Sequence, residues 1–279
     1  MRNTAKITTA VLAAGALTLG LSACGSDKDS SSSSADRSGP LVVAASPVPH
    51  AEILNFIKDH LAKKAGLDLE VKEFQDYIVP NTATEDGSVD ANYFQNQPYL
   101  DDFNQKRGTH IVPVVTVHLE PLGLYSHKVK SADALKSGAT VAVPNDAVNE
   151  ARALKLLASK GLITLKDDAG NTATPQDISK NPKNLKFTEV EAAQTPRSLD
   201  DVDAAVINGN YAIAADLKPA KDALVLESAT NNPYGNFLAV KKGNEDDPRV
   251  KKLAKLLTSP EVKKFIEDKY AGSVIPSFK

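Results

Sequence analysis

Short β-rich runs alternate with helical patterns from residue 41 onward, and this alternation limits the chain to the α/β class. Residues 41–45 form a β-rich run, residues 51–65 carry a helical pattern, and residues 67–74 form a second β-rich run. Gly66 stands where this helix ends, at a position that readily takes a left-handed backbone. A strand, a helix and a strand in this order form a βαβ unit. We therefore expect mainly parallel sheets with flanking helices.

A second unit of the same kind follows later in the chain. Residues 139–143 predict a strand, residues 147–160 predict a helix, and Gly161 stands just past its end. Further strands are predicted at residues 110–118, 185–190, 203–207, 223–226 and 237–241, and helices at residues 248–257 and 260–270. Two such units in one chain predict two lobes.

The first residues have the composition of an export signal. A basic start precedes an apolar stretch at residues 7–21, which is too short and too often interrupted to span a bilayer. The stretch leads to Leu-Ser-Ala-Cys at residues 21–24, which resembles the bacterial lipobox, in which the cysteine is acylated and becomes the new N-terminus. Cys24 is the only cysteine in the sequence, so an internal disulfide is excluded. We predict a lipoprotein signal peptide over residues 1–23 and a lipid anchor at Cys24.

Residues 24–40 join the predicted anchor to the first predicted strand. The segment is rich in serine and has no apolar periodicity, so it cannot bury enough surface to offset the entropy of ordering it. We expect it to be a flexible tether between a lipid bilayer and a folded part that begins near residue 41.

Charge and motifs exclude several classes of function. The chain carries 33 basic and 35 acidic residues, for a formal charge of −2, so we expect no nucleic-acid partner. It has no G-x-S-x-G elbow, phosphate-binding loop, dinucleotide-binding turn or H-E-x-x-H pair, so we expect neither an enzyme nor a cofactor. No two histidines have the spacing of four that places zinc ligands on one helical face. A metal site would have to assemble from distant residues such as His50 and His118 with an acidic residue, and we expect none.

Polar side chains gather next to predicted strand ends. Ligands of open α/β sheets bind where the carboxyl ends of strands meet helix N-termini. Arg152 lies near the start of the helix after residues 139–143, where its guanidinium either binds a carboxylate or is a solvated helical side chain. Asn208 follows one predicted strand and Asn236 precedes another, although asparagine is also common in turns and caps.

Aromatic side chains are concentrated in residues 93–103. They offer an apolar wall for a thioether or aliphatic ligand side chain, and core packing is an equally good explanation for Phe103. Gln95 and Asn96 are harder to explain as core residues and favour a hydrogen-bonding cleft.

Seven segments that follow one another along the chain carry a resemblance to a known family. They are EFQDYIVPN, DANYFQNQPYLD, VHLEPLGLYS, VPNDAVNEARAL, NPKNLKF, TPRSLDDVDAAVINGNYA and NPYGN. They resemble the NlpA/MetQ family of methionine-binding lipoproteins, the substrate-binding components of ABC importers. The resemblance implies a two-lobed periplasmic-binding-protein-like fold of type II with a hinge that the chain crosses twice. One lobe would hold residues 41–117 and 233–279, and the other residues 118–232.

The resemblance also implies roles for individual residues. The implied ligand-binding residues are Tyr77, Phe94, Asn96, Tyr99, His118, Asn149, Arg152, Asn208 and Asn236. Arg152 would pair with the α-carboxylate of the ligand, two of the asparagines, Asn208 and Asn236, would hold its polar backbone groups, and the aromatic residues would form its side-chain pocket. Asn96 departs from the family, whose members commonly carry FQH at this place.

These roles imply a protein that captures L-methionine, with D-methionine as a further ligand, and delivers it to a membrane-embedded ABC permease with its ATPase subunit. The implied location is the extracytoplasmic side of the cell membrane, with acylated Cys24 in the bilayer. The alternatives are a binding protein for another small amino acid, for a methionine-containing dipeptide or for a metal, and a surface lipoprotein of the adhesin type. The lipobox fits all of them, and the cleft residues are what separate them.

Overall fold

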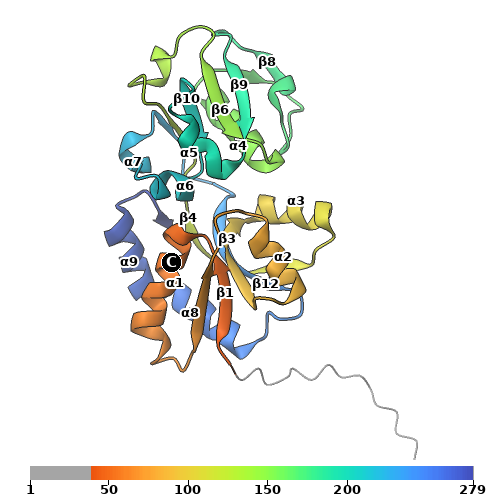
Figure 1. Ribbon diagram of the computed structural model, residues 1–279, viewed down its shortest axis with the longest axis vertical. Helices are drawn as coiled ribbons and strands as arrows, with labels where there is room; N and C mark the ends of the chain where they lie inside the picture. Colours follow the sequence, from red (N-terminus) through yellow and green to blue (C-terminus); the bar gives the residue numbers. More distant parts are fainter. Residues whose placement is uncertain (1–38, 279) are drawn as a thin grey trace, which may run out of the picture. The chain divides into compact units, whose positions relative to one another are not determined.

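The computed structural model describes residues 39–278, which form two α/β lobes, each with its own sheet and apolar core (Figure 1). The predicted signal peptide, Cys24 and almost all of the predicted tether lie outside the described residues. Within the described part of the chain, no helix is long and apolar enough to cross a membrane.

The first lobe is built on a six-stranded sheet in the order β13-β4-β12-β3-β1-β2. The strands are β1 (Leu41–Ala45), β2 (Leu69–Glu73), β3 (Ala91–Asn96), β4 (Ile111–Leu119), β12 (Gly235–Lys241) and β13 (Ile275–Pro276). β1 runs parallel to β2 and β3, as the predicted βαβ unit requires. β12 runs antiparallel to β3 and β4, so the sheet is mixed rather than mainly parallel. β4 runs toward the second lobe and β12 runs back from it, so β12 is antiparallel to β4.

Helices cover both faces of this sheet (Figure 1). They are α1 (Glu52–Ile57), α8 (Pro248–Leu257) and α9 (Pro260–Tyr270) on one face, and α2 (Val79–Asp86) and α3 (Gln97–Arg107) on the other. Alternate side chains of β1 enter the two cores, because Val43 packs with α1 and α8 while Ala44 packs with α2. α1 is flanked by wider helical turns at Pro47–Ala51 and Lys58–Ala62, and Gly66 has the expected positive φ of 60°.

The second lobe has a five-stranded sheet in the order β11-β5-β10-β6-β9. The strands are β5 (Gly123–Tyr125), β6 (Thr140–Pro144), β9 (Lys186–Val190), β10 (Ala204–Ile207) and β11 (Val225–Leu226). β6 is parallel to β9 and β10, whereas β5 is antiparallel to β10 and β11. This sheet too is therefore mixed. The strands β7 (Thr164–Leu165) and β8 (Ile178–Lys180) form a separate hairpin.

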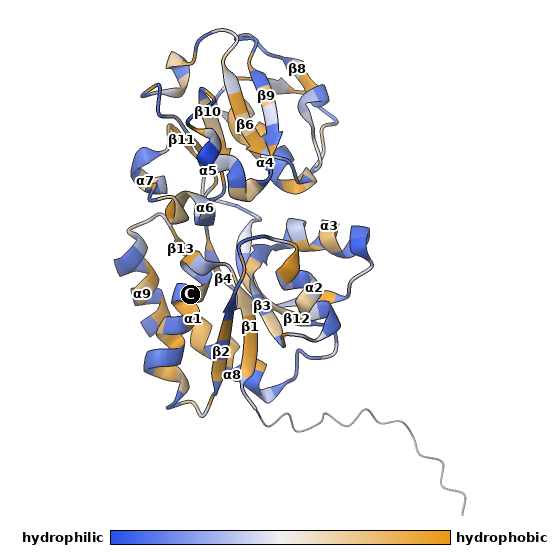
Figure 2. Ribbon diagram, viewed as in Figure 1, coloured by the Kyte–Doolittle hydropathy of each residue, from blue (hydrophilic) through white to orange (hydrophobic). Residues whose placement is uncertain are grey.

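The helices of the second lobe are α4 (Ala147–Ser159), α5 (Thr195–Ser198), α6 (Gly209–Ala214) and α7 (Pro219–Asp222). Leu154 of α4 shares one core with Val141, and Tyr211 of α6 shares a second core with Ala142, the next residue of β6. The strands β1, β6 and β10 are accordingly apolar, and hydrophilic residues lie along the outer helices (Figure 2).

The chain passes between the two sheets twice, once between Leu119 and Gly123 and once between Leu226 and Gly235. β4 extends to Leu119, just beyond the predicted lobe boundary after residue 117, and the predicted boundary after residue 232 falls within the returning segment. The lobe boundaries themselves remain predictions.

Candidate functional site

A narrow pocket lies among strand ends and helix starts of both lobes. It is lined by Tyr77, Phe94, Gln95, Asn96, Tyr99, Glu120, Asn149, Arg152, Asn208, Gly209, Asn210 and Asn236. The cavity has a volume of about 20 Å³. All the ligand-binding residues implied by the sequence resemblance line this pocket except His118, which lies behind Glu120.

Arg152 is buried rather than solvated, with 4% of its surface exposed. It lies in the second turn of α4, whose first turn is capped by Asp146. Its Nε and Nη2 donate to the two carboxylate oxygens of Glu227, at 2.8 and 2.5 Å, and Nη2 also donates to the carbonyl of Glu120 at 3.1 Å. Arg152 holds the pKa of Glu227 below its usual value, against the effect of burial. None of these three bonds involves Nη1 of the guanidinium.

A chain of hydrogen bonds orients Asn208. The amide nitrogen of Asn149 donates to both carboxylate oxygens of Asp146 at 3.0 Å, and its Oδ1 accepts from Nδ2 of Asn208 at 2.9 Å. Burial raises the pKa of Asp146, and the bonds from Asn149 act in the opposite direction. The Oδ1 of Asn208 is buried and has no partner within the described chain. An N–H group of a ligand would supply the missing donor.

Aromatic rings form the apolar wall of the pocket. Tyr77, Phe94, Tyr99 and Phe103 pack together, with ring centres 5.7 Å apart for Tyr77 and Tyr99. Phe103 is buried but does not line the pocket, so it belongs to the core behind the wall. The hydroxyl of Tyr77 donates to Oδ1 of Asn210 at 2.6 Å and so joins the first lobe to α6.

Two amide side chains at the end of β3 have different partners. The Oδ1 of Asn96 accepts from the backbone N–H of Tyr99 at 3.2 Å and caps α3. Gln95 exchanges hydrogen bonds of 2.7 and 2.8 Å with Asn81, which ties α2 to the sheet. These bonds explain why a polar segment can be buried.

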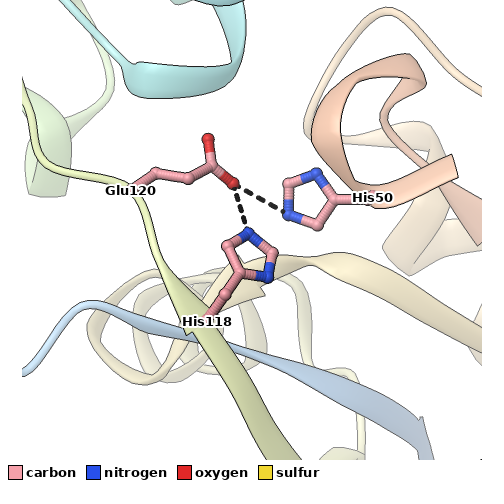
Figure 3. A group of neighbouring side chains, drawn as sticks. All are labelled: His50, His118 and Glu120. Atoms are coloured by element: carbon pink, nitrogen blue, oxygen red, sulfur yellow. Dashed lines mark hydrogen bonds and ion pairs between the residues drawn. The ribbon is translucent and has the colours of Figure 1, made fainter. Parts of the chain in front are cut away.

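Glu120, at the end of β4, is a pocket residue that the sequence analysis missed. Its Oε1 lies 2.8 Å from Nε2 of His118 and 3.2 Å from Nε2 of His50 (Figure 3). Burial lowers the pKa of His50 to about 4 and that of His118 to about 3, so both imidazoles are neutral at pH 7. Burial raises the pKa of Glu120, and this rise is opposed by His50 and Arg152. The one available sequence signal was an acidic residue two positions after the predicted strand at residues 110–118.

The same three residues could ligate a metal, since ligand atoms of His50, His118 and Glu120 lie within 4.8 Å of one another. The sequence analysis named His50 and His118, with an acidic residue, as an example of residues far apart in the sequence that could form a metal site. The separations of 2.8 and 3.2 Å between oxygen and nitrogen atoms match hydrogen bonds, and neutral imidazoles can donate both. The arrangement is therefore that of a hydrogen-bonded triad.

Comparisons with known proteins cover almost the whole described chain. Residues 41–278 match the family model described as NlpA lipoprotein. The methionine-binding lipoprotein MetQ of Bacillus subtilis is 43% identical over 260 residues, covering 92% of this chain and 93% of that protein. The D-methionine-binding lipoprotein MetQ of Escherichia coli K12 is 44% identical over 214 residues, covering 76% of this chain and 79% of that protein.

Solved structures resemble the fold closely. A nutrient binding protein from Burkholderia cenocepacia bound to methionine has a TM-score of 0.83 at 49% identity, covering 85% of this chain and 100% of that one. A periplasmic substrate-binding protein of an ABC transporter from Coxiella burnetii has a TM-score of 0.81 at 44% identity, with coverages of 85% and 100%. These similarities confirm the predicted two-lobed class of fold.

Proposed function

The chain belongs to the NlpA lipoprotein family, and on this premise we propose that it captures methionine between its two lobes and delivers it to an ABC importer. The family predicted from the seven sequence segments is confirmed. A relative solved with methionine and another described as the substrate-binding protein of an ABC transporter support the proposed ligand and role.

The observation that carries the proposal is the composition of the pocket. The pocket is lined by Arg152, which would bind an α-carboxylate, and by Asn208, whose Oδ1 is unpaired. It is also lined by the aromatic residues Phe94 and Tyr99, which would contact a thioether side chain. Asn149 orients Asn208, and Asn236 lies beside His50, so both would act on the polar end of the ligand.

Binding would be driven by removing the ligand from water. Burial of a methionine side chain contributes roughly 1.5–3 kcal/mol. The bond from Tyr77 to Asn210 and the bond of 2.9 Å from the hydroxyl of Tyr211 to the carbonyl of Gln75 join the lobes when the pocket is closed. No bond of the ligand changes in this mechanism, so the proposed function is binding and delivery rather than catalysis.

Asn96 takes the place at which the family commonly carries histidine. Because its Oδ1 already caps α3, its Nδ2 is the group that would donate to a ligand. We propose that Asn96 keeps a hydrogen-bond donor at this place and that methionine remains the ligand.

The proposal also includes a lipid anchor and a location at the cell membrane. An acylated Cys24 would hold the protein on the extracytoplasmic side of the cell membrane, where it would dock with the permease and its ATPase subunit. One acyl chain alone gives marginal attachment, and two or more make it stable.

A thermal-shift screen tests the function. The protein is unfolded and refolded to remove carried-over ligand, then heated with each amino acid, with methionine dipeptides and with divalent metals. Ligand at 100 times its Kd stabilises by about 2.7 kcal/mol, a rise of about 5–10 °C in Tm for a domain of this size. We expect this rise with methionine. A rise with metals alone would favour a metal-binding protein, and no rise with any ligand would favour an adhesin.

A further inference from the structure

We propose that four lysines of the first lobe form a docking surface for the anionic headgroups of a lipid bilayer. They are Lys63, Lys64, Lys252 and Lys255, and we call them the lysine surface. The inference goes beyond the proposed function, because it concerns a face of the protein that does not line the ligand pocket. It rests on the proposed lipid anchor for its setting and adds which face of the first lobe lies against the bilayer.

Basic residues are concentrated in the helices on one face of the first sheet. Residues 248–270, which form α8 and α9, hold seven basic and three acidic residues, and residues 47–66, around α1, hold three and two. This layer therefore has a net charge of +5, whereas residues 39–278 as a whole hold 28 basic and 32 acidic residues. An anionic surface would repel a protein that carried its negative charge evenly, but it would attract this face.

The four lysines lie together on that layer. Lys63 and Lys64 directly follow the helical turn Lys58–Ala62, and Nζ of Lys252 donates to the carbonyl of Gly66 at 2.9 Å, which brings α8 beside this segment. Lys255 follows Lys252 by three residues and lies on the same side of α8. All four side chains are exposed.

The lysine surface is not neutralised by nearby carboxylates. Other lysines of the same helices form ion pairs, such as Lys251 with Asp246 and Lys264 with Asp268. Within residues 39–278 none of the four lysines forms an ion pair, although Asp59 and Asp68 are close to Lys63 and Lys64 in the sequence. Their charge is therefore available to an external anion.

The described chain begins beside the lysine surface. Nη1 of Arg249, in the first turn of α8, donates to the carbonyl of Pro40 at 3.0 Å, just before β1 (Figure 1). Lys252 follows Arg249 by three residues on the same side of the helix. Residues 25–38, which separate Cys24 from residue 39, can span roughly 50 Å at most. An anchor at Cys24 would thus keep this end of the first lobe within that distance of the bilayer.

An apolar groove next to the lysine surface favours a bilayer over a dissolved anion. Phe56 of α1 and Phe265 of α9 stack with ring centres 4.4 Å apart and line a cavity of about 440 Å³. Phe56 also contacts His60, which lies one turn before Lys63 and Lys64. Aromatic rings and the aliphatic stems of lysines suit the bilayer interface, where apolar groups lie beneath charged headgroups.

The ligand pocket lies at the opposite end of the first sheet. Asn96 lines the pocket at the end of β3, and β3 runs parallel to β1, whose start lies near the lysine surface. Docking through the lysine surface would therefore hold the pocket away from the bilayer, where dissolved ligand can reach it.

The test measures binding to vesicles without the anchor. The chain from residue 24 onward, with Cys24→Ser, contains both sheets and every described helix. It is co-sedimented with vesicles of phosphatidylglycerol and phosphatidylcholine in equal parts, and with vesicles of phosphatidylcholine alone. We expect binding to the anionic vesicles only, at least about tenfold weaker in about 300 mM than in about 20 mM NaCl, because salt screens the charges. Equal binding to both kinds of vesicle, or binding to neither, would overturn the proposal.

Two variants with the same change in charge locate the binding. One carries Lys63→Gln, Lys64→Gln, Lys252→Gln and Lys255→Gln. The control replaces four exposed lysines of the second lobe and carries Lys160→Gln, Lys180→Gln, Lys186→Gln and Lys221→Gln. Each lysine near an anionic surface strengthens binding about fivefold, so the first variant should bind at least about 30-fold more weakly and the control should stay within about threefold of the parent chain. Equal losses in the two variants would show that the surface lies elsewhere.

Calorimetric titration of the same samples with methionine separates this inference from the proposed function. A parent chain that binds methionine and no vesicles would overturn the lysine surface and leave the proposed function standing. A parent chain that binds anionic vesicles and no methionine would refute the proposed function alone. Unchanged methionine affinity in the first variant would show that it is folded, and if it did not fold, the lipid and salt dependence of the parent chain would still decide.

Discussion

Replacement of Arg152 by alanine should affect binding and stability through two different contacts. The variant removes the proposed partner of the ligand carboxylate, and truncation of one member of a buried charge pair costs about 2–5 kcal/mol, or roughly 30-fold to several thousandfold in Kd. It also leaves the carboxylate of Glu227 without its two-pronged partner. Breaking a buried ion pair in this way costs about 3–5 kcal/mol. Because Glu227 is 15% exposed and keeps a bond from the N–H of Leu122, we expect the lower figure, about 3 kcal/mol.

A second variant separates the two effects. In Arg152→Ala with Glu227→Gln the unpaired charge at residue 227 is removed, so most of the lost stability should return while methionine binding stays lost. Stability is measured by denaturant unfolding without ligand, and affinity by calorimetry. An Arg152→Ala protein that binds methionine within threefold of the wild type would refute the assigned role of Arg152. A double variant as unstable as the single one would refute the account of the ion pair.

Three further changes test other parts of the site. Tyr99→Ala removes part of the aromatic wall, so calorimetry should show methionine weakened about tenfold or more and alanine much less; equal losses would count against the wall. Burial and the nearby Glu189 raise the pKa of Glu150 to about 7. The carboxyl group of Glu150 therefore binds its proton more tightly in the folded protein than in the unfolded chain, and the wild type loses stability as the pH rises from about 4.5 to 7. Glu150→Gln should therefore gain thermal stability relative to the wild type at pH 8 and not at pH 4, and a difference independent of pH would contradict this pKa. Gly209→Ala should weaken methionine binding, because its Cβ would displace Glu120, and unchanged affinity would show that the carboxylate does not need this space.

Elements with strong local signals could be predicted from the sequence. The helices α8 and α9 have the predicted bounds, because each begins with proline and is capped by the preceding residue, Asp247 or Ser259. The strand β1 also matches, since its apolar run is bounded by polar and turn-forming residues.

The strand β3 carries no such signal. Its polar residues Asn92 and Gln95 are fully buried, and they are satisfied by Asn81 on α2, which a local pattern cannot reveal. Polar side chains in a segment usually predict exposure to solvent, but here a tertiary hydrogen-bond network allows them to be buried.

The residues of the candidate site also fall into two groups, those with a local sequence signal and those without one. Arg152 could be identified because it lies near the start of a helix that follows a predicted strand, Asn208 because it directly follows a predicted strand, and the sequence resemblance implied their roles. Glu227 could not, because its pairing with Arg152 joins residues 75 positions apart in the chain. Glu120 was not identified either, because its contact with His50 joins residues that lie far apart in the sequence.

Calorimetric titration of the refolded, ligand-free protein with L-methionine tests the central claim most directly. The account predicts saturable binding of one methionine per chain, because one pocket holds both the polar groups for its backbone and the aromatic wall for its side chain. The absence of saturable binding by correctly refolded protein would contradict it.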